Sequence, residues 1–189
     1  MQLPEAWSPL IGADIYVLDL VLRGIIRAGA SVLDIGCGGG RNLPVLAHAG
    51  ARISAVDADP AAVAACTRVL AQAPGTHACR VARLPDLGLE QRFDAVLCIA
   101  VLHFAPDQAA FHAWADACWA RLLPGGVFLA RLSTRIALPE AAGHFAYRPT
   151  LDDIVACEQR WQATRIDPLK TTLVEERRVM STWTLRRPA

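Results

Sequence analysis

The sequence has 189 residues, of which 53% are hydrophobic and 20% are charged. These fractions are typical of a globular chain and exclude an intrinsically disordered one, and the length fits a single domain over residues 1–189. Nineteen Lys and Arg residues against 18 Asp and Glu residues give a net charge of +1, which argues against a large nucleic-acid-binding surface.

Cysteine usage and the first residues indicate the compartment. The cysteines stand at positions 37, 66, 79, 98, 118 and 157, without zinc-site spacing and mostly within apolar stretches. The opening residues MQLPEAWSPL lack the order of a signal peptide, and no apolar run reaches the roughly 20 residues of a membrane helix. We therefore expect a cytoplasmic protein with reduced thiols, no bound metal and no membrane contact.

In chain order, the pattern begins with an irregular arm over residues 1–12. Apolar residues at spacings of three and four then predict an amphipathic helix over 13–28, ended by Gly29. Strands and helices alternate after that. The predicted strands are 31–35, 51–56, 78–82, 93–100 and 127–132, and the predicted helices are 41–49, 59–71 and 106–122. Apolar strands that alternate with helices predict a doubly wound α/β fold with a parallel sheet.

The C-terminal part follows a different pattern. A variable stretch with Gly and Pro, residues 133–149, precedes a predicted helix over about 150–164. Two β-like runs follow at 165–174 and 179–185, with only Glu175–Arg178 between them. Because so short a link cannot hold a parallel crossover connection, we expect these two strands to pair as an antiparallel hairpin.

The sharpest motif is the glycine-rich turn after the first predicted strand, with glycines at 36, 38, 39 and 40. Glycines let a ligand approach the backbone, and the amides at the start of the following helix face the ligand and favour negative groups. A dinucleotide-binding turn would need glycine at position 41, where this sequence has Arg41. Asp34 precedes the turn, and its carboxylate suits a positive group such as the amino group of S-adenosylmethionine rather than an anionic pyrophosphate.

A second carboxylate closes the next predicted strand. Asp57 lies 21 positions after Gly36, close to the spacing at which an acidic residue reaches the ribose of a bound nucleoside. Its two acceptor oxygens match the paired 2′ and 3′ hydroxyls. A chance glycine-rich turn and an aspartate that only begins a helix are the alternatives, and the two features together favour a ligand-binding site.

In this order, the motifs resemble those of class I S-adenosylmethionine-dependent methyltransferases. The matching segments are VLDIGCGGGRN (32–42), ISAVDADP (53–60), FDAVLCIAVLHF (93–104) and LLPGGVFLARL (122–132). The sequence resembles most the small bacterial members, of the tellurite-resistance-like and small-molecule type. The resemblance implies a Rossmann-like sheet of seven strands, six parallel and the seventh antiparallel, inserted between the fifth and sixth.

The resemblance also implies a set of cofactor-binding residues. It places Asp34 near the methionine amino end, Asp57 on the ribose and Ala58 against the adenine. The other residues it assigns to the cofactor are Gly36, Cys37, Gly38, Gly40, Asn42, Ile99 and Ala100. The family often has an acidic adenine contact after the third strand; this sequence offers Arg80 or Arg83 there, and Asp86 could substitute.

Catalysis needs few residues in such an enzyme, because a sulfonium is an activated methyl donor and the protein mainly aligns the reactants. His103, just after the fourth predicted strand, is the best candidate for a general base; the alternative is that it only packs there. His144 and Tyr147 are candidates for the substrate wall. Trp7 and Tyr16 are candidates for covering the cationic cofactor.

Absent motifs narrow the acceptor. The sequence lacks the D/N-P-P-Y/F/W motif of amino-methylating DNA enzymes after the fourth predicted strand, and it has no large insertion for target recognition. We expect a small-molecule acceptor and a monomer or homodimer. A methyltransferase that acts on protein or RNA, a non-catalytic S-adenosylmethionine-binding module and a nicotinamide-dependent oxidoreductase remain as alternatives.

Overall fold

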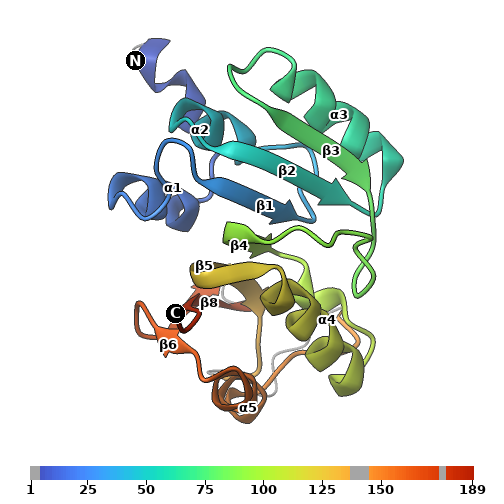
Figure 1. Ribbon diagram of the computed structural model, residues 1–189. Helices are drawn as coiled ribbons and strands as arrows, with labels where there is room; N and C mark the ends of the chain where they lie inside the picture. The colour runs from blue at the N-terminus through green and yellow to red at the C-terminus, as the bar shows by residue number, and fades with distance from the viewer. Residues whose placement is uncertain (1–4, 137–144, 175–177) are drawn as a thin grey trace. The chain divides into compact units, whose positions relative to one another are not determined.

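The computed structural model describes residues 5–136, 145–174 and 178–189. The chain divides into two compact units, an N-terminal unit that ends at Arg83 and a C-terminal unit that begins at Leu84 (Figure 1). No helix among the described residues is long and apolar enough to cross a membrane. The single domain expected from the length stays a prediction.

The N-terminal unit contains a short parallel sheet flanked by helices. Its strands have the order β3-β2-β1, and Asp34 pairs in register with Ala55, which pairs with Cys79 (Figure 1). Because parallel strands share one direction, the carboxyl ends of β1 and β2 meet at the same edge. The elements are η1 (Glu5–Leu10), α1 (Ile15–Leu22), β1 (Ser31–Ile35), α2 (Leu43–His48), β2 (Arg52–Asp57), α3 (Pro60–Leu70) and β3 (His77–Val81).

Helix starts in this unit follow the sequence signals, whereas the end of the first helix does not. Asp59 caps α3 by accepting the Ala61 N–H, as the Asp-Pro pair predicts. Helix α1 ends at Leu22, well before the predicted residue 28. Gly24 has φ +66°, and this left-handed residue turns the chain out of the helix. The predicted extent of 13–28 was therefore wrong at its C-terminal end.

The C-terminal unit contains a mixed sheet. Strands β4 and β5 are parallel, and β8 is antiparallel to β5, β6 and β7 (Figure 1). The elements are β4 (Phe93–Ile99), η2 (Leu102–Phe104), α4 (Gln108–Ala120), β5 (Leu122–Ser133), α5 (Leu151–Trp161), β6 (Thr164–Arg165), β7 (Lys170–Val174) and β8 (Arg178–Arg186).

The predicted C-terminal hairpin is confirmed. Strands β7 and β8 pair antiparallel, with Lys170 opposite Thr182 and Val174 opposite Arg178. Strand β8 lies between β5 and the pair β6 and β7, as expected for an inserted antiparallel strand. The described residues form eight strands instead of seven, because the expected sixth strand is divided into β6 and β7. Pro168 lies in this interruption and has no N–H to donate to a neighbouring strand.

The start of β5 differs from the prediction of 127–132. The strand begins at Leu122 and includes the Pro124–Gly126 segment that we expected to precede it. The pairing with β4 is irregular here, passing from Phe93 opposite Leu122 to Ala95 opposite Val127. A Cβ at Gly126 would lie 2.8 Å from a backbone oxygen, so only glycine fits this close approach.

Stacked indoles form part of the core of the C-terminal unit. Trp161 stacks on Trp119 at 4.7 Å and on Trp183 at 5.5 Å between ring centroids. Two of the three ring N–H groups donate hydrogen bonds: Trp161 donates to Asp116 and Trp183 donates to Glu158, at 2.6 and 2.8 Å. These contacts join α4, α5 and β8 and keep the unit rigid around β4 and β5.

Candidate functional site

The glycine-rich turn lies at the carboxyl ends of β1 and β2. The backbone N–H groups of Gly36 and Cys37 both donate to the Val56 carbonyl, at 2.8 and 3.1 Å. The Gly38 N–H donates to the Asp57 carboxylate at 2.8 Å. The second strand therefore holds the turn that follows the first, at the edge where nucleotide-binding α/β sheets bind their ligands.

The glycines of this turn are required by its backbone. Gly36, Gly38 and Gly40 have φ values of +71°, +51° and +82°, in the left-handed region that side chains disfavour. A Cβ at Gly38 or Gly39 would meet no atom within 4 Å. The backbone at these two positions thus borders open space, which a ligand could occupy.

Asp57 organises the turn and retains acceptor capacity. Its Oδ2 accepts the Gly38 N–H at 2.8 Å, and its Oδ1 accepts the Asp59 N–H at 3.0 Å. Each carboxylate oxygen has two lone pairs, so one acceptor position per oxygen is left for ribose hydroxyls. Asp57 is partly exposed and Ala58 beside it is exposed. The sequence pointed to Asp57 as a ribose ligand and missed its part in shaping the turn.

Asp34 is the most unusual group of the N-terminal unit. The residue is only 1% exposed, and among the described residues no hydrogen-bond donor reaches its Oδ2 atom. Burial raises the pKa of this carboxyl to about 7; Arg41 lowers the pKa and Asp57 raises it further. A buried polar atom without a partner is costly, and such atoms are rare away from binding or catalytic sites. A cationic ligand at the turn would supply the missing donor.

Two cysteines pack the turn against α3. The sulfur atoms of Cys37 and Cys66 lie 3.3 Å apart, and the Cys66 Sγ lies 3.2 Å from the Gly38 carbonyl oxygen. Burial raises the pKa of both thiols, so they stay protonated at neutral pH. Cys37 thus packs behind the turn as a protonated thiol, and its predicted contact with the cofactor stays a prediction. Cys66 was missed by sequence reasoning, and only its apolar position in a predicted helix could have indicated burial.

Asn42 connects the turn to the first helix. It is buried, and its Oδ1 accepts the Asp14 N–H at 2.9 Å. Asp14 in turn caps α1 by accepting the Tyr16 N–H, and its carboxylate forms a salt bridge with Arg41 at 3.3 Å. One of these contacts uses the side-chain oxygen of Asn42, and the predicted cofactor contact of Asn42 stays a prediction.

The structure says less about the other residues that were predicted to cover the cofactor or the substrate. Tyr16 is half-buried at the start of α1. The side chain of Trp7, and His144 altogether, lie outside the residues that the structure describes.

In the C-terminal unit, the chain turns sharply after β4. Ile99 is the last residue of the strand and is nearly buried. Ala100 has φ +62°, and its N–H donates to the Arg131 carbonyl of β5 at 2.7 Å. A left-handed conformation costs a residue with a side chain roughly 1–2 kcal/mol. Strained residues of this kind gather at ligand sites, and the predicted cofactor contacts of Ile99 and Ala100 stay predictions.

His103 is buried in the short helix η2. Only 3% of it is exposed, and its Nδ1 accepts the Ser133 N–H at 2.9 Å. An accepting Nδ1 places the proton of the neutral ring on Nε2, so Nε2 is a donor in this arrangement. This geometry favours a donating rather than a proton-accepting ring, and the general-base role of His103 stays a prediction.

Tyr147 is anchored to the helix that follows it. Its hydroxyl donates to Asp153 Oδ2 at 2.6 Å, and the same carboxylate accepts the Thr150 N–H and the Gln108 side-chain amide. Burial acts to raise the pKa of Asp153, but these hydrogen bonds outweigh it and lower the pKa to about 2. Burial and the bond to Asp153 raise the pKa of Tyr147, so its hydroxyl is a structural donor at neutral pH.

Beside Asp153 lies an arrangement that resembles a catalytic triad. The His112 Nδ1 is 3.3 Å from the Cys157 Sγ, and its Nε2 is 3.3 Å from Asp153 Oδ1. A nucleophile must reach a substrate as a thiolate. Cys157 is 0% exposed, and burial raises its pKa to about 11. The cluster therefore fastens α4 to α5 and is not a nucleophilic site.

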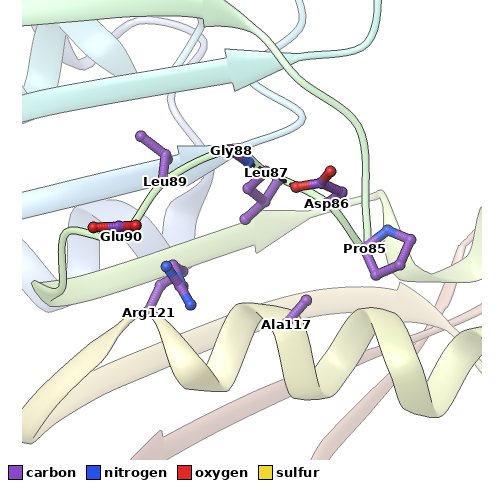
Figure 2. Close-up of a pocket in the computed structure, with 8 residues that line it drawn as sticks. All are labelled: Pro85, Asp86, Leu87, Gly88, Leu89, Glu90, Ala117 and Arg121. Atoms are coloured by element: carbon purple, nitrogen blue, oxygen red, sulfur yellow. Dashed lines mark hydrogen bonds between the residues drawn. The ribbon is translucent and has the colours of Figure 1, made fainter.

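The residues considered for adenine recognition are exposed. Arg80, in β3, and Arg83 are exposed, and Asp86 accepts the Gly88 N–H at 3.0 Å. Asp86 lines a pocket of about 410 Å³ that is formed by the segment 85–90 and by the C-terminal end of α4 with the residue that follows it. Figure 2 shows the residues that line it. Glu90 and Arg121 also line this pocket, so its rim carries charges of both signs. No group of potential metal ligands occurs among the described residues.

The fold and the turn define a class of protein: a Rossmann-like α/β protein with a nucleoside-type binding turn. The sequence matches the family described as "Methyltransferase domain" over residues 33–128, and the chain belongs to this family. The resemblance found in the motifs is thereby confirmed, and with it the expected cofactor class, S-adenosylmethionine.

Curated relatives are ubiquinone biosynthesis O-methyltransferases. The protein from Xylella fastidiosa strain M23 is 35% identical over 134 residues, which cover 69% of this chain and 53% of the relative. The protein from Xanthomonas oryzae pv. oryzae strain PXO99A is 37% identical over 129 residues, which cover 67% of this chain and 53% of the relative. The chain thus spans about half the length of the curated relatives it matches.

Solved structures confirm the fold. The magnesium protoporphyrin IX methyltransferase ChlM from Synechocystis PCC 6803, with bound SAH, has a TM-score of 0.75 at 19% identity, with 99% of this chain and 89% of that chain covered. TehB from Haemophilus influenzae has a TM-score of 0.77 at 16% identity, and the match covers 95% of this chain and 63% of that chain. At these identities the likeness concerns the fold alone, and it agrees with the predicted Rossmann-like α/β class.

Proposed function

We propose that this protein binds S-adenosylmethionine at the carboxyl ends of β1 and β2 and transfers its methyl group to a small-molecule acceptor. The observation that carries the proposal is Asp34, a buried carboxylate directly before a glycine turn that borders open space, with one oxygen that has no hydrogen-bond partner among the described residues. An anion in that place disfavours a pyrophosphate and favours a ligand with a positive amino group.

The residues of the N-terminal unit fit this cofactor by their chemistry. Asp34 would pair with the amino group, and Asp57 would accept the ribose hydroxyls with the lone pairs that its backbone contacts leave free. Gly38 and Gly40 would let the ligand approach the backbone, and Ala58 would lie against the adenine. From the C-terminal unit we propose Ile99 and Ala100 as further cofactor contacts.

The chemistry requires mainly positioning. When bound, the sulfonium supplies an activated methyl group for in-line displacement, so the protein has to orient the acceptor and exclude water. His103 is the candidate that would meet the acceptor. With Nδ1 accepting from Ser133, the orientation of its ring is fixed.

A small acceptor is supported by the names of the relatives, which act in ubiquinone biosynthesis or on magnesium protoporphyrin IX. These acceptors belong to those proteins, and the acceptor of this chain is open. We further propose a cytoplasmic location and a monomer or homodimer without nucleic-acid partners. A non-catalytic cofactor-binding module is the second candidate, because Arg80 and Arg83 stand where an acidic adenine contact is common.

Calorimetric titration tests the proposal. Wild type should bind S-adenosylmethionine and S-adenosylhomocysteine and should not bind NAD. Asp57→Ala should weaken binding by about 1–3 kcal/mol, roughly 5- to 150-fold, because ribose hydroxyls lose their acceptor. Asp57→Asn keeps one acceptor for the turn and should lose less. Asp152→Ala, at an exposed carboxylate in α5, is the matched control and should bind as wild type.

Two outcomes would contradict the proposal. NAD binding as tight as S-adenosylhomocysteine would reassign the site to dinucleotides. Unchanged affinity in a folded Asp57→Ala variant, checked by circular dichroism, would remove Asp57 from the site. Cofactor binding without methyl transfer to any small acceptor would favour the non-catalytic module.

A further inference from the structure

One charged residue of the glycine turn has no role in the proposed function. Arg41 follows Gly40 directly, at the position where a dinucleotide-binding turn has glycine. Its side chain is 52% exposed, and its guanidinium makes one hydrogen bond among the described residues, from Nη2 to Asp14 Oδ2 at 3.3 Å. A guanidinium has five N–H donors, so four are left for a ligand.

Asp14 keeps the Arg41 side chain beside the turn. The Asp14 side chain is 0% exposed, and its Oδ1 accepts the Tyr16 N–H at 3.0 Å, so the carboxylate is fixed at the start of α1. Its backbone N–H donates to Asn42, the residue after Arg41, at 2.9 Å. The bond from Arg41 is longer than the roughly 2.7–2.9 Å of a strong charge-assisted hydrogen bond. Asp14 thus orients the guanidinium and leaves it able to bind a second anion.

Arg41 and Asp34 are two opposite charges of one turn that do not pair with each other. Asp34 precedes the turn and Arg41 follows it. Burial raises the pKa of the Asp34 carboxyl, and the charge of Arg41 acts to lower it, so the two groups are close enough to interact. Among the described residues no hydrogen bond joins them, and Asp34 Oδ2 has no partner at all. An unpaired buried charge is costly, and a ligand with both charges would relieve the cost.

The amino acid end of S-adenosylmethionine carries the complementary charges. Its ammonium and carboxylate groups are bonded to one carbon, so a protein that binds both needs an anion and a cation that lie close together and remain unpaired. Guanidinium binds carboxylate with two parallel N–H···O bonds, which adds geometric specificity to the charge. Gly38 and Gly39, which lie between the two charges in the sequence, border open space that could admit such a ligand.

We propose that Arg41 binds the carboxylate of the cofactor and makes this group a requirement for tight binding. With Asp34 on the ammonium group, the turn would recognise both charges of the amino acid end and select nucleosides that carry it intact. The inference rests on the proposed function, because it assigns a specificity-determining residue to that cofactor site.

Two ligands that differ only in the carboxylate test the inference by calorimetry. S-adenosylhomocysteine has the complete amino acid end, and 5′-S-(3-aminopropyl)-5′-thioadenosine keeps the nucleoside, the sulfur and the amino group without the carboxylate. Wild type should bind S-adenosylhomocysteine about 10-fold tighter. This is the low end of what a hydrogen bond to a charged group supplies, because Arg41 is half-exposed.

Arg41→Gln should abolish this preference. Its affinity for S-adenosylhomocysteine should fall about 10-fold, whereas the decarboxylated ligand should bind at least as tightly as to wild type, because a cation that repels its ammonium group is gone. Arg41→Lys keeps the charge without the planar fork and should retain part of the preference. Arg68→Gln, which removes a positive charge from an exposed position of α3, is the matched control and should retain all of it.

A second variant guards against misfolding. Arg41→Gln leaves the buried Asp14 carboxylate without its cation, which is destabilising, so the double variant Asp14→Asn/Arg41→Gln removes both charges. It should lose the preference in the same way. Circular dichroism shows which variants fold, and unchanged affinity for the decarboxylated ligand shows that the nucleoside site is intact.

The outcomes separate the inference from the function on which it rests. Wild type that binds both ligands equally, or a preference that survives in either folded variant, would overturn the role of Arg41. An equal loss of affinity for both ligands in the folded variants would also overturn it, because the residue would then only tie the turn to α1. Wild type that binds neither ligand would overturn the proposed function itself.

Discussion

Replacing Asp34 by Asn should stabilise the free protein and weaken cofactor binding. The folded pKa of about 7, against an ordinary 3.8, means that the folded state holds the proton more tightly than the unfolded state. The contribution of Asp34 to stability is therefore highest below about pH 4, falls as the pH rises toward 7 and stays lower above it. The difference of about three pKa units corresponds to about 4 kcal/mol, undiminished by solvent because the residue is buried.

An amide at position 34 cannot ionise, so this penalty disappears at neutral pH. The new amide group brings unpaired donors that cost about 1–3 kcal/mol, which leaves a net stabilisation of about 1–3 kcal/mol. The affinity for the cofactor should change in the opposite direction to the stability. Its amino group pairs with the ionised carboxylate, so wild-type affinity should rise up to about tenfold per pH unit below about pH 7 and level off above it.

The assay combines unfolding and binding. Urea unfolding at about pH 7.5 compares wild type with Asp34→Asn, and Asp152→Asn serves as an exposed control. Calorimetry with S-adenosylhomocysteine from about pH 5.5 to 8.5, in buffers of different ionisation enthalpy, measures affinity and proton release together. Wild-type affinity that is flat over this range, or a slope that persists in Asp34→Asn, would refute the assignment of Asp34 to the amino group.

Two further substitutions test the turn and the buried network of the C-terminal unit. Gly40→Ala should cost about 1–3 kcal/mol in urea unfolding, because φ is +82° and the new Cβ would lie 3.0 Å from a leucine side chain. Gly39→Ala, with no atom within 4 Å of its Cβ, should stay within about 0.5 kcal/mol of wild type, and equal losses would contradict the geometry. Asp153→Asn should cost about 2 kcal/mol at neutral pH, since a pKa of about 2 stabilises the folded state above pH 4 and this gain is lost as the pH falls toward 2. Acid unfolding followed by tryptophan fluorescence compares the stability of wild type and Asp153→Asn. An unchanged midpoint in the variant would contradict a stabilising role of the Asp153 carboxylate.

Much of the secondary structure could be predicted from patterns of neighbouring residues in the sequence. The alternating strands, the Asp59 cap of α3 and the C-terminal hairpin were all predicted, because each depends on residues close together in the chain. The glycine turn was also readable, since glycine adopts left-handed positions such as those of Gly36 and Gly38 at the lowest cost. Boundaries were less certain: α1 ends early, at Leu22 just before Gly24, and β5 begins before its Pro-Gly-Gly segment.

The partners of the site residues could not be read in the same way. Cys66 packs behind the turn from 29 residues away, and Asn42 contacts Asp14 from 28 residues away. Tyr147 suggested a substrate wall from its position, whereas its hydroxyl is bound to Asp153. Such pairings depend on how elements pack, and a sequence pattern carries no record of which distant side chains meet.

The sequence by itself determined the type of fold, the family and the two carboxylates around the turn. The spacing of apolar side chains and the placement of glycines depend on residues that are close together in the chain, so both can be recognised in the sequence alone. Only the tertiary structure showed that one Asp34 oxygen has no hydrogen-bond partner among the described residues, that the His103 ring faces Ser133 with its accepting nitrogen, and that Asp14 orients Arg41. Burial and hydrogen bonding arise when distant segments pack together, and they decide the charge and proton position that give these residues their chemistry.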